Sequence, residues 1–146
     1  MWLKIGTIFR IVSVKISLYT KFEMKNCIFC QIVEGKVPAK IVYKNKDVIA
    51  FKDINPIAPV HILIIPQKHI ESLSKTSDKD IKLLGAILRS AANIAKENKL
   101  EAFRVLNVNG EKAGQTVKHI NFHLVGGWRN VSLKMESDPE GLRRSQ

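Results

Sequence analysis

Two histidines and an asparagine alternate with apolar residues near the C-terminal end of this 146-residue chain. They are His119, Asn121 and His123, within the stretch 117–125. A β-strand points alternate side chains to opposite faces, so we expect these three polar side chains to share one face. Three adjacent polar side chains fill a hydrophobic core poorly, because each needs a buried partner. Their spacing therefore predicts a functional site, and the segment 114–116 just before it offers backbone N–H groups and a hydroxyl as a cradle for an anion.

The two cysteines of the chain, Cys27 and Cys30, are spaced as Cys-x-x-Cys. On spacing alone, a pair of buried apolar cysteines is the simplest interpretation. A thioredoxin-like redox motif would need a βαβ setting, which the pattern of the chain does not show. Two cysteines also cannot build a framework of disulfide bridges. The residues by themselves leave the role of this pair open.

Two helices are predicted among the elements that position these residues. Asn26 is a suitable N-cap for a short helix over 27–34, and Gly35 is a suitable stop. Ser77, with Asp80 three residues on, resembles a capping box at the start of a longer helix. That helix has about five turns, and its apolar stripe is interpreted as core. The stripe consists of Ile81, Leu84, Ile87, Leu88, Ala91, Ile94 and Ala95.

Five short segments rich in β-branched and apolar residues predict strands. These segments are 40–44, 48–52, 61–66, 103–108 and 117–125. The first two are separated by a polar turn and form a hairpin, and prolines mark 55–59 as a loop. The third is nearly all apolar, which is typical of a central strand covered on both faces. Five strands and two helices indicate an α+β domain with a mainly antiparallel sheet.

The composition is that of a globular protein, with 45% apolar and 25% charged residues. The formal net charge of +11 attracts phosphate-bearing partners in general. The lysines are scattered along the chain, however, and a solvated surface explains them. The sequence lacks the interleaved aromatic and basic residues of a single-strand platform, and it lacks zinc-finger or helix-turn-helix spacing. Nucleic-acid binding therefore has no positive support.

Residues 1–23 form a basic leader with no acidic residue before Glu23. Lys15 interrupts its apolar stretch, so it matches neither a secretory signal nor a membrane span, and we expect a cytoplasmic protein. The leader is either an organelle transit peptide or an upstream extension of a reading frame that starts at Met24. We favour the second interpretation. The predicted organisation is a leader over 1–23, one domain over 24–127 and a tail over 128–146.

Several motifs, in the same order, make the chain similar to the histidine triad (HIT) family of nucleotide hydrolases and transferases. The family signature is His-φ-His-φ-His-φ-φ, where φ is apolar, and it usually follows Gly-Gln-Ser/Thr. Residues 114–127 match it, and further landmarks lie at 26–30, 51–56, 59–70 and 109–114. The resemblance runs from Met24 to Gly127. It implies a HIT-like fold, a purine nucleotide ligand of the AMP or GMP class, and a homodimer.

Asn121 departs from the family at the most consequential position. In the family, the middle histidine attacks the α-phosphate and forms a nucleotidyl-histidine that water then hydrolyses. The lone pair of an amide nitrogen is delocalised, so asparagine cannot replace that nucleophile. Three interpretations stay open: a natural relative that binds nucleotides without catalysis, direct activation of water by His123 or His61, or an introduced change of one codon base. A non-enzymatic nucleotide-sensing or protein-interaction module is the alternative function.

The other site positions mostly match the family. The resemblance implies that His123 lies near the phosphate and His61 near the leaving group. It further implies contacts with the nucleotide from a set of four residues: Asp53 at the ribose hydroxyls, Ile54 beside the base, and Gln115 with Thr116 in the phosphate loop. A second departure is Val108, where the family often has asparagine. Its neighbours Asn107 and Asn109 should face the other way by strand alternation.

The resemblance also implies a role for the cysteines, because some bacterial HIT proteins bind zinc through four matching positions. Here these positions hold Cys27, Cys30, His69 and His119. Two thiolates and two imidazoles make a closed tetrahedral structural zinc site. In that case His119 is structural, and the catalytic face retains Asn121 and His123.

Overall fold

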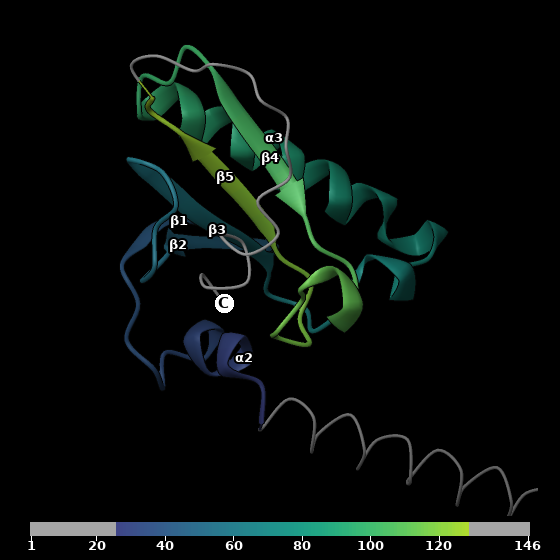
Figure 1. The fold of residues 1–146 in the computed structure, drawn as a ribbon. Coiled ribbons are helices and arrows are strands. Elements are labelled where there is room, and N and C mark those ends of the chain that lie inside the picture. The colour runs from purple at the N-terminus through teal and green to yellow at the C-terminus, as the bar shows by residue number, and fades with distance from the viewer. Residues whose placement is uncertain (1–25, 129–146) are drawn as a thin grey trace, which may run out of the picture.

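A five-stranded antiparallel sheet with one long and one short helix forms the body of the molecule (Figure 1). The computed structural model describes residues 26–128, so the predicted leader and the tail beyond Trp128 lie outside the described residues. The sheet order is β1-β2-β3-β5-β4. The elements are α2 (Ile28–Val33), β1 (Ile41–Lys44), β2 (Val48–Lys52), β3 (Val60–Pro66), α3 (Ile81–Glu97), β4 (Phe103–Asn107) and β5 (Phe122–Gly126). The predicted α+β class, the hairpin and both helices are confirmed.

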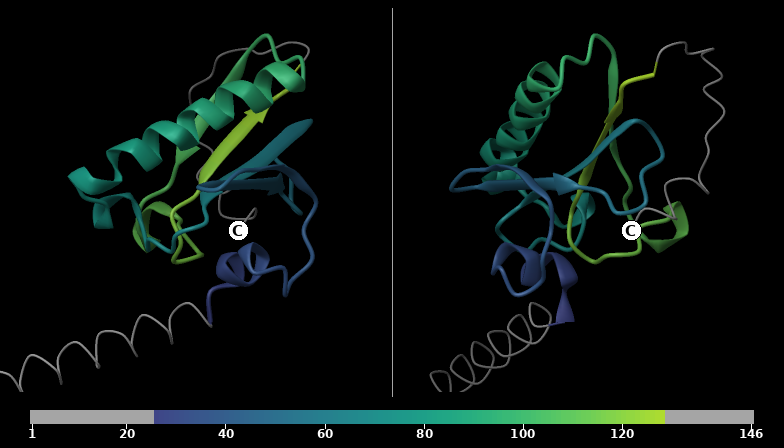
Figure 2. Two further views of the ribbon diagram at one scale, coloured as in Figure 1. Left: turned by 180° about the vertical axis from the view of Figure 1, so that it is seen from behind. Right: turned by 90° about the vertical axis from the view of Figure 1, so that its left-hand side faces the viewer.

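The sheet is covered on both faces. Helix α3 lies along one face (Figure 2), where Ile87 and Ile94 pack against strand residues such as Ile62. Helix α2 covers the other face, where Phe29 packs with Leu63 and other buried residues. Alternate residues of β3 thus belong to different cores, as predicted for a central strand.

The start of α3 follows the predicted capping box. The backbone N–H of Ser77 donates to Asp80 Oδ2 over 3.0 Å, and the reciprocal bond from the Asp80 backbone to the Ser77 side chain is also present. A short 3₁₀ turn, Asp78–Asp80, comes between the cap and the first α-helical residue. The cap thereby satisfies N–H groups that would otherwise lack partners.

The predicted strand over 117–125 is wrong in its first half, because β5 begins only at Phe122. Strand β4 ends at Asn107, which pairs with Phe122, so β4 offers no ladder partner to the preceding residues. Their backbone bonds go elsewhere: the N–H of Ile120 donates to Ile70 O over 2.7 Å. The predicted alternation still holds, since Ile120, Phe122 and Leu124 all lie in the core beneath α3.

Helix α2 begins differently from the prediction and ends as predicted. Cys27, not Asn26, occupies the N-cap and makes no capping hydrogen bond with its side chain. At the other end, Gly35 has a φ of 73°, a left-handed conformation that glycine adopts without strain, and it stops the helix as predicted.

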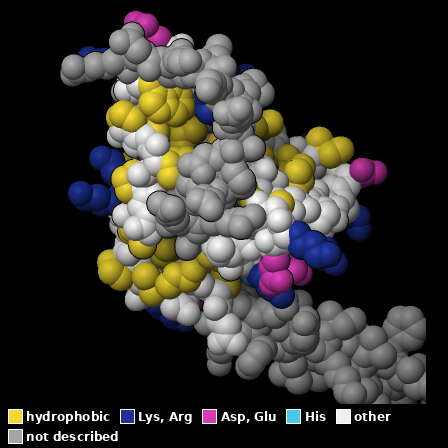
Figure 3. Space-filling view, viewed as in Figure 1, with side chains coloured by type: hydrophobic (Ala, Val, Ile, Leu, Met, Phe, Trp, Pro, Cys, Tyr) yellow, Lys and Arg dark blue, Asp and Glu magenta, His cyan; other side chains and the backbone are white. Residues whose placement is uncertain are grey.

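The lysine and arginine side chains lie at separate places on the face shown in Figure 3, in agreement with a solvated basic surface. Within residues 26–128, no helix is both long enough and apolar enough to cross a membrane.

Candidate functional site

Two groups of side chains that could bind a metal or take part in chemistry lie in the described part of the chain. The first, here called the Cys/His cluster, consists of Cys27, Cys30, His69 and His119. The second, called the Asp/His cluster, consists of Asp53, His61 and His123. Within each cluster the candidate ligand atoms lie within 4.8 Å of one another. All seven residues were singled out from the sequence, and the fold brings them together as two separate groups.

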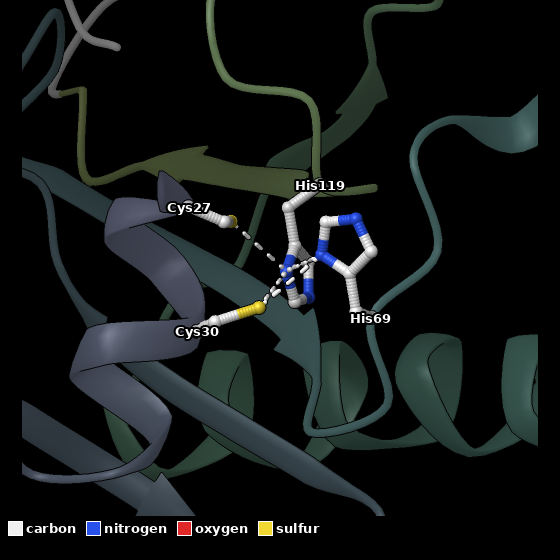
Figure 4. A group of neighbouring side chains, drawn as sticks. All are labelled: Cys27, Cys30, His69 and His119. Carbon is white, nitrogen blue, oxygen red and sulfur yellow. Dashed lines mark hydrogen bonds between the residues drawn. The ribbon is translucent and has the colours of Figure 1, made fainter. Parts of the chain in front are cut away.

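The Cys/His cluster joins three parts of the chain (Figure 4). Its cysteines project from the first turn of α2, His69 follows β3, and His119 precedes β5. Cys30 Sγ lies 3.2 Å from His69 Nδ1, and both sulfur atoms lie 3.6 Å from His119 Nδ1. The two Nδ1 atoms are 3.3 Å apart. The four donor atoms therefore face one common point.

These separations fit a tetrahedral zinc site. Zinc binds sulfur at about 2.3 Å and nitrogen at about 2.0–2.1 Å, so the edges of its coordination tetrahedron are about 3.3–3.8 Å. His119 also has the correct tautomer, because its Nε2 lies 2.9 Å from Pro66 O. A proton on Nε2 donates to that carbonyl and leaves the lone pair of Nδ1 inside the cluster.

The pKa values of the two thiols also favour a bound cation. Burial works against a charged Cys27, but its hydrogen-bond contacts with the side chains of His119 and His69 prevail and lower its pKa to about 5. Burial, followed by the negative charge of Cys27, raises the pKa of Cys30 to about 12. The protein alone thus stabilises one thiolate and disfavours a second. A divalent cation would supply the charge that two thiolates require.

The Asp/His cluster is a buried chain of hydrogen-bonding groups at the other end of β3. His61 Nε2 lies 2.9 Å from His123 Nδ1 and 3.5 Å from Asp53 Oδ2. The backbone N–H of Ile57 donates to His61 Nδ1 over 3.3 Å. The Asp53 carboxylate is fixed from its own loop, because Oδ1 accepts the N–H of Asn55 over 2.7 Å.

These bonds assign the protons of both histidines. Since Nδ1 of His61 accepts a bond from Ile57, its proton is on Nε2 and is donated to His123 Nδ1, which leaves the proton of His123 on Nε2. Burial lowers the pKa of His61 to about 4, and burial together with the charge of His61 lowers the pKa of His123 to about 4. Both imidazoles are therefore neutral at pH 7. A protonated Nε2 cannot ligate a metal, so the Asp/His cluster is suited to hydrogen bonding of a ligand.

Asn121 lies between His119 and His123 in the sequence and is fully buried. Its Nδ2 donates to His119 O over 3.0 Å, and its own backbone carbonyl accepts a bond of 2.7 Å from Asn107 Nδ2. Asn107 was expected to face away from this site. Strand alternation ends with β4, however, and the side chain of this last strand residue reaches the backbone of the neighbouring segment. Position 121 thus carries a buried amide, whose nitrogen has no available lone pair.

The loop before His119 is braced by Gln115. Both hydrogens of its Nε2 are donated to backbone carbonyls, those of Glu71 at 2.7 Å and Val117 at 2.9 Å. Its Oε1 accepts the N–H of Gly110 over 2.8 Å. Thr116 is exposed beside it and lines a small pocket with His69. The amide of Gln115 therefore shapes the loop.

A pocket of about 870 Å³ adjoins the Asp/His cluster. Its walls are mostly apolar and include Phe29 of α2, Phe51 of β2 and Leu63 of β3. Asp53 and the highly exposed Ile54 also line it. The aromatic walls were missed in the sequence, because an apolar residue in an amphipathic pattern is interpreted as core. The sequence held one signal for them, because Phe51 lies two residues before Asp53 and residues at that spacing on a strand share a face.

Comparisons with known proteins extend these observations. A sequence profile described as "Scavenger mRNA decapping enzyme C-term binding" matches residues 26–136. The "14 kDa zinc-binding protein" of Zea mays is 42% identical over 103 residues, which cover 68% of this chain and 80% of that protein. "Adenylylsulfatase HINT1" of Arabidopsis thaliana is 40% identical over 103 residues, covering 68% and 70%. The solved structure of a HIT family hydrolase from Legionella pneumophila is 39% identical, covers 73% of this chain and 97% of that one, and gives a TM-score of 0.70.

Proposed function

The chain belongs to the histidine triad (HIT) family, and we propose that it binds purine nucleoside monophosphates and related AMP-linked compounds, with hydrolysis impaired by Asn121. The reaction class of the site is hydrolysis of nucleoside phosphoramidates or similar substrates. A similar protein from Arabidopsis is named an adenylylsulfatase, which supports a substrate with an AMP moiety.

The observation that carries this proposal is the position of Asp53, which belongs to both the apolar pocket and the buried histidine pair. It lines the pocket with Ile54 and lies 3.5 Å from His61. A nucleotide presents a base with flat aromatic faces, ribose hydroxyls and a phosphate in that order. The pocket accepts the base, and the carboxylate of Asp53 accepts hydrogen bonds from the ribose. The Nε2–H of His123 donates to a phosphate oxygen, and His61 holds His123 in that orientation.

Loss of turnover follows from the chemistry at position 121. Nδ2 of Asn121 carries two hydrogens and no available lone pair, so no bond to phosphorus forms there. His123 is a hydrogen-bond donor through Nε2, and with a pKa of about 4 it is a weak base at pH 7. Direct activation of water by His123 or His61 therefore contributes little. A binding site without turnover also suits a nucleotide sensor, which is the alternative function of this fold.

We also propose that the Cys/His cluster holds a structural zinc ion. The fit of four donor atoms to a tetrahedron supports it, as does the similarity to a protein named for zinc binding. All four positions are protein ligands, so the ion would stabilise the fold and leave no vacant position for a substrate. Two cysteines kept as thiolates agree with the predicted cytoplasmic location.

A homodimer is the assembly that we propose. Strand β4 lies at an edge of the described sheet, where one side of its backbone lacks a strand partner among residues 26–128. Helix α3 exposes Ile81 and Leu88, seven residues apart and thus on one face. A second copy of the chain that pairs along β4 would cover both the edge and the apolar face.

The proposal is tested by calorimetry and by an assay of adenosine 5′-phosphoramidate hydrolysis. We expect AMP and GMP to bind with little turnover of the phosphoramidate. Asn121→His should raise hydrolysis by about 10³-fold or more, since removal of a nucleophile costs at least this much in well-studied enzymes. Asn93→His on the exposed side of α3 is the matched control and should change nothing. Ordinary hydrolysis by the unmodified chain would refute the impairment, and no binding of AMP or GMP would refute the function.

A further inference from the structure

Helix α2 belongs to both functional regions. Its two cysteines enter the Cys/His cluster, while Ile28, Phe29 and Ile32 line the large pocket. We propose that α2 couples the two, so that metal in the Cys/His cluster strengthens nucleotide binding and bound nucleotide strengthens metal retention. This inference rests on the proposed nucleotide-binding function.

Phe29 makes the most direct connection. Its ring contacts Phe51 edge-on, with centroids 5.6 Å apart, and both residues line the pocket. The same ring contacts His119 at 6.0 Å between centroids, again edge-on. One side chain thus touches a pocket wall and a metal-ligating imidazole. A shift of His119 or α2 on metal loss moves this wall.

Helix α2 has little intrinsic stability. It has six residues, no capping hydrogen bond from a side chain, no acidic residue in its first turn and no basic residue in its last turn. Helices this short do not form alone in water, so tertiary contacts hold α2 in place. Its anchors are the apolar contacts around Phe29 and Ile32 and the two cysteines of the cluster. Metal removal takes away one of these two anchors.

The loop on the other side of the cluster supplies a second connection. Val117 lines the large pocket, and it also lines the small pocket of about 380 Å³ that adjoins Cys27 and His69. It lies two residues before His119, and its carbonyl is held by Gln115. The pocket is therefore bounded on two sides by segments that carry metal ligands.

Thermodynamic linkage makes the coupling reciprocal. If metal raises the affinity for a nucleotide by some factor, the nucleotide raises the affinity for metal by the same factor. Couplings between sites in proteins are commonly 5- to 150-fold. We expect about 10-fold here, because one of two anchors of the pocket wall is lost while the apolar anchor remains.

The experiment uses the full chain with zinc alone as the metal probe and AMP as the nucleotide probe. Calorimetry measures the Kd for AMP in zinc-loaded and chelated protein, with circular dichroism to confirm that both are folded. A competing chromophoric chelator measures the Kd for zinc with and without AMP, and this second arm starts from folded, zinc-loaded protein. Zinc should lower the Kd for AMP about 10-fold, and AMP should lower the Kd for zinc by the same factor. Equal affinities in both arms would overturn the coupling and leave nucleotide binding intact, whereas no binding of AMP in either state would refute the proposed function itself.

Phe29→Leu separates coupling from folding, because it keeps all four metal ligands and an apolar residue in the pocket wall. We expect zinc to stay bound and the effect of AMP on zinc affinity to fall from about 10-fold to less than 3-fold. Tyr43→Leu is the matched aromatic control on β1, outside both regions, and should retain the full factor of about 10-fold. An unchanged factor in Phe29→Leu would overturn the role of this ring as the connection.

Discussion

The Cys/His cluster and the Asp/His cluster each contain two histidines, of which all but the half-buried His69 are buried. The two clusters differ in the backbone group that contacts a buried imidazole. In the Cys/His cluster, Nε2 of His119 meets the carbonyl of Pro66, so the proton points outward and a lone pair points inward. In the Asp/His cluster, Nδ1 of His61 meets the N–H of Ile57, so the proton points inward. A backbone acceptor thus prepares a metal ligand, and a backbone donor prepares a hydrogen-bond donor for an anion.

The largest expected effect tests the first half of this comparison. Removal of metal by a chelator should lower the free energy of unfolding by about 4 kcal/mol, the value for a ligand present at a thousand times its Kd. For a domain of this size, the melting temperature should fall by about 15 °C or more. Differential scanning calorimetry with and without chelator measures this shift.

Cys30→Ser provides the control for metal removal, since it leaves three of the four ligands. Its melting temperature should already be low and should not respond to the chelator. An unchanged melting temperature of the unmodified chain after complete chelation would contradict a structural role for the Cys/His cluster.

The second prediction concerns the neutral histidines of the Asp/His cluster. Burial lowers the pKa of His61 and of His123 to about 4, whereas a histidine in an unfolded chain titrates near 6.5. Below pH 6.5 the unfolded chain therefore binds protons that the folded chain does not. The free energy of unfolding should fall as the pH drops from 6.5 toward 4, by up to about 1.4 kcal/mol per pH unit for each histidine.

His61→Gln isolates this contribution from acid effects at the cysteines. Urea unfolding at pH 7, 6 and 5 should give a dependence on pH that is weaker by about 1 kcal/mol per unit than in the unmodified chain. Metal release adds the same dependence to both proteins and cancels in the difference. If the free energy of unfolding depended on pH equally in both proteins, the burial of a neutral His61 would be contradicted.

The family resemblance named most residues of the two clusters, whereas periodicity predicted only part of the geometry around His119 and His123. The alternation from His119 to His123 placed three side chains on one face, because period-two patterning depends on local backbone geometry. It could not reveal that β5 starts at Phe122, since that depends on where β4 ends. The separation of His119 from His123 into different clusters likewise depends on distant partners, namely α2 for one and β3 for the other.

The aromatic walls of the pocket show a second limit. Phe29 and Phe51 are buried, and their pattern is the same as that of any core residue. A residue in a pocket wall differs from a core residue because it has no packing neighbours on the side that faces the pocket. Only the folded chain reveals that difference. Asp53 and Ile54 were found through the resemblance, since a carboxylate and an exposed isoleucine have many ordinary explanations.

The third prediction tests whether the Asp/His cluster and the large pocket form one binding site. Asp53→Asn keeps the shape of the side chain but turns one acceptor into a donor, and ribose hydroxyls then lose a charged partner. We expect the Kd for AMP to rise about 10-fold, as for loss of one hydrogen bond to a charged group. Asp47→Asn in the turn between β1 and β2 is the matched control. Calorimetry with unchanged affinity in Asp53→Asn would separate the pocket from the cluster.

The smallest expected effect on the ligand concerns Gln115, which was predicted to contact the nucleotide. Its amide is already committed to the backbone of Gly110, Glu71 and Val117. Gln115→Ala should therefore lower the free energy of unfolding by about 1–3 kcal/mol, because buried backbone groups lose their partners, while the Kd for AMP changes less than about 3-fold. Gln67→Ala, which removes one bond to Asn45 in a turn, should cost less than about 0.5 kcal/mol. A loss of AMP affinity in Gln115→Ala with unchanged stability would instead assign this side chain to the ligand, because a bracing residue cannot act on binding without first acting on the loop that it holds.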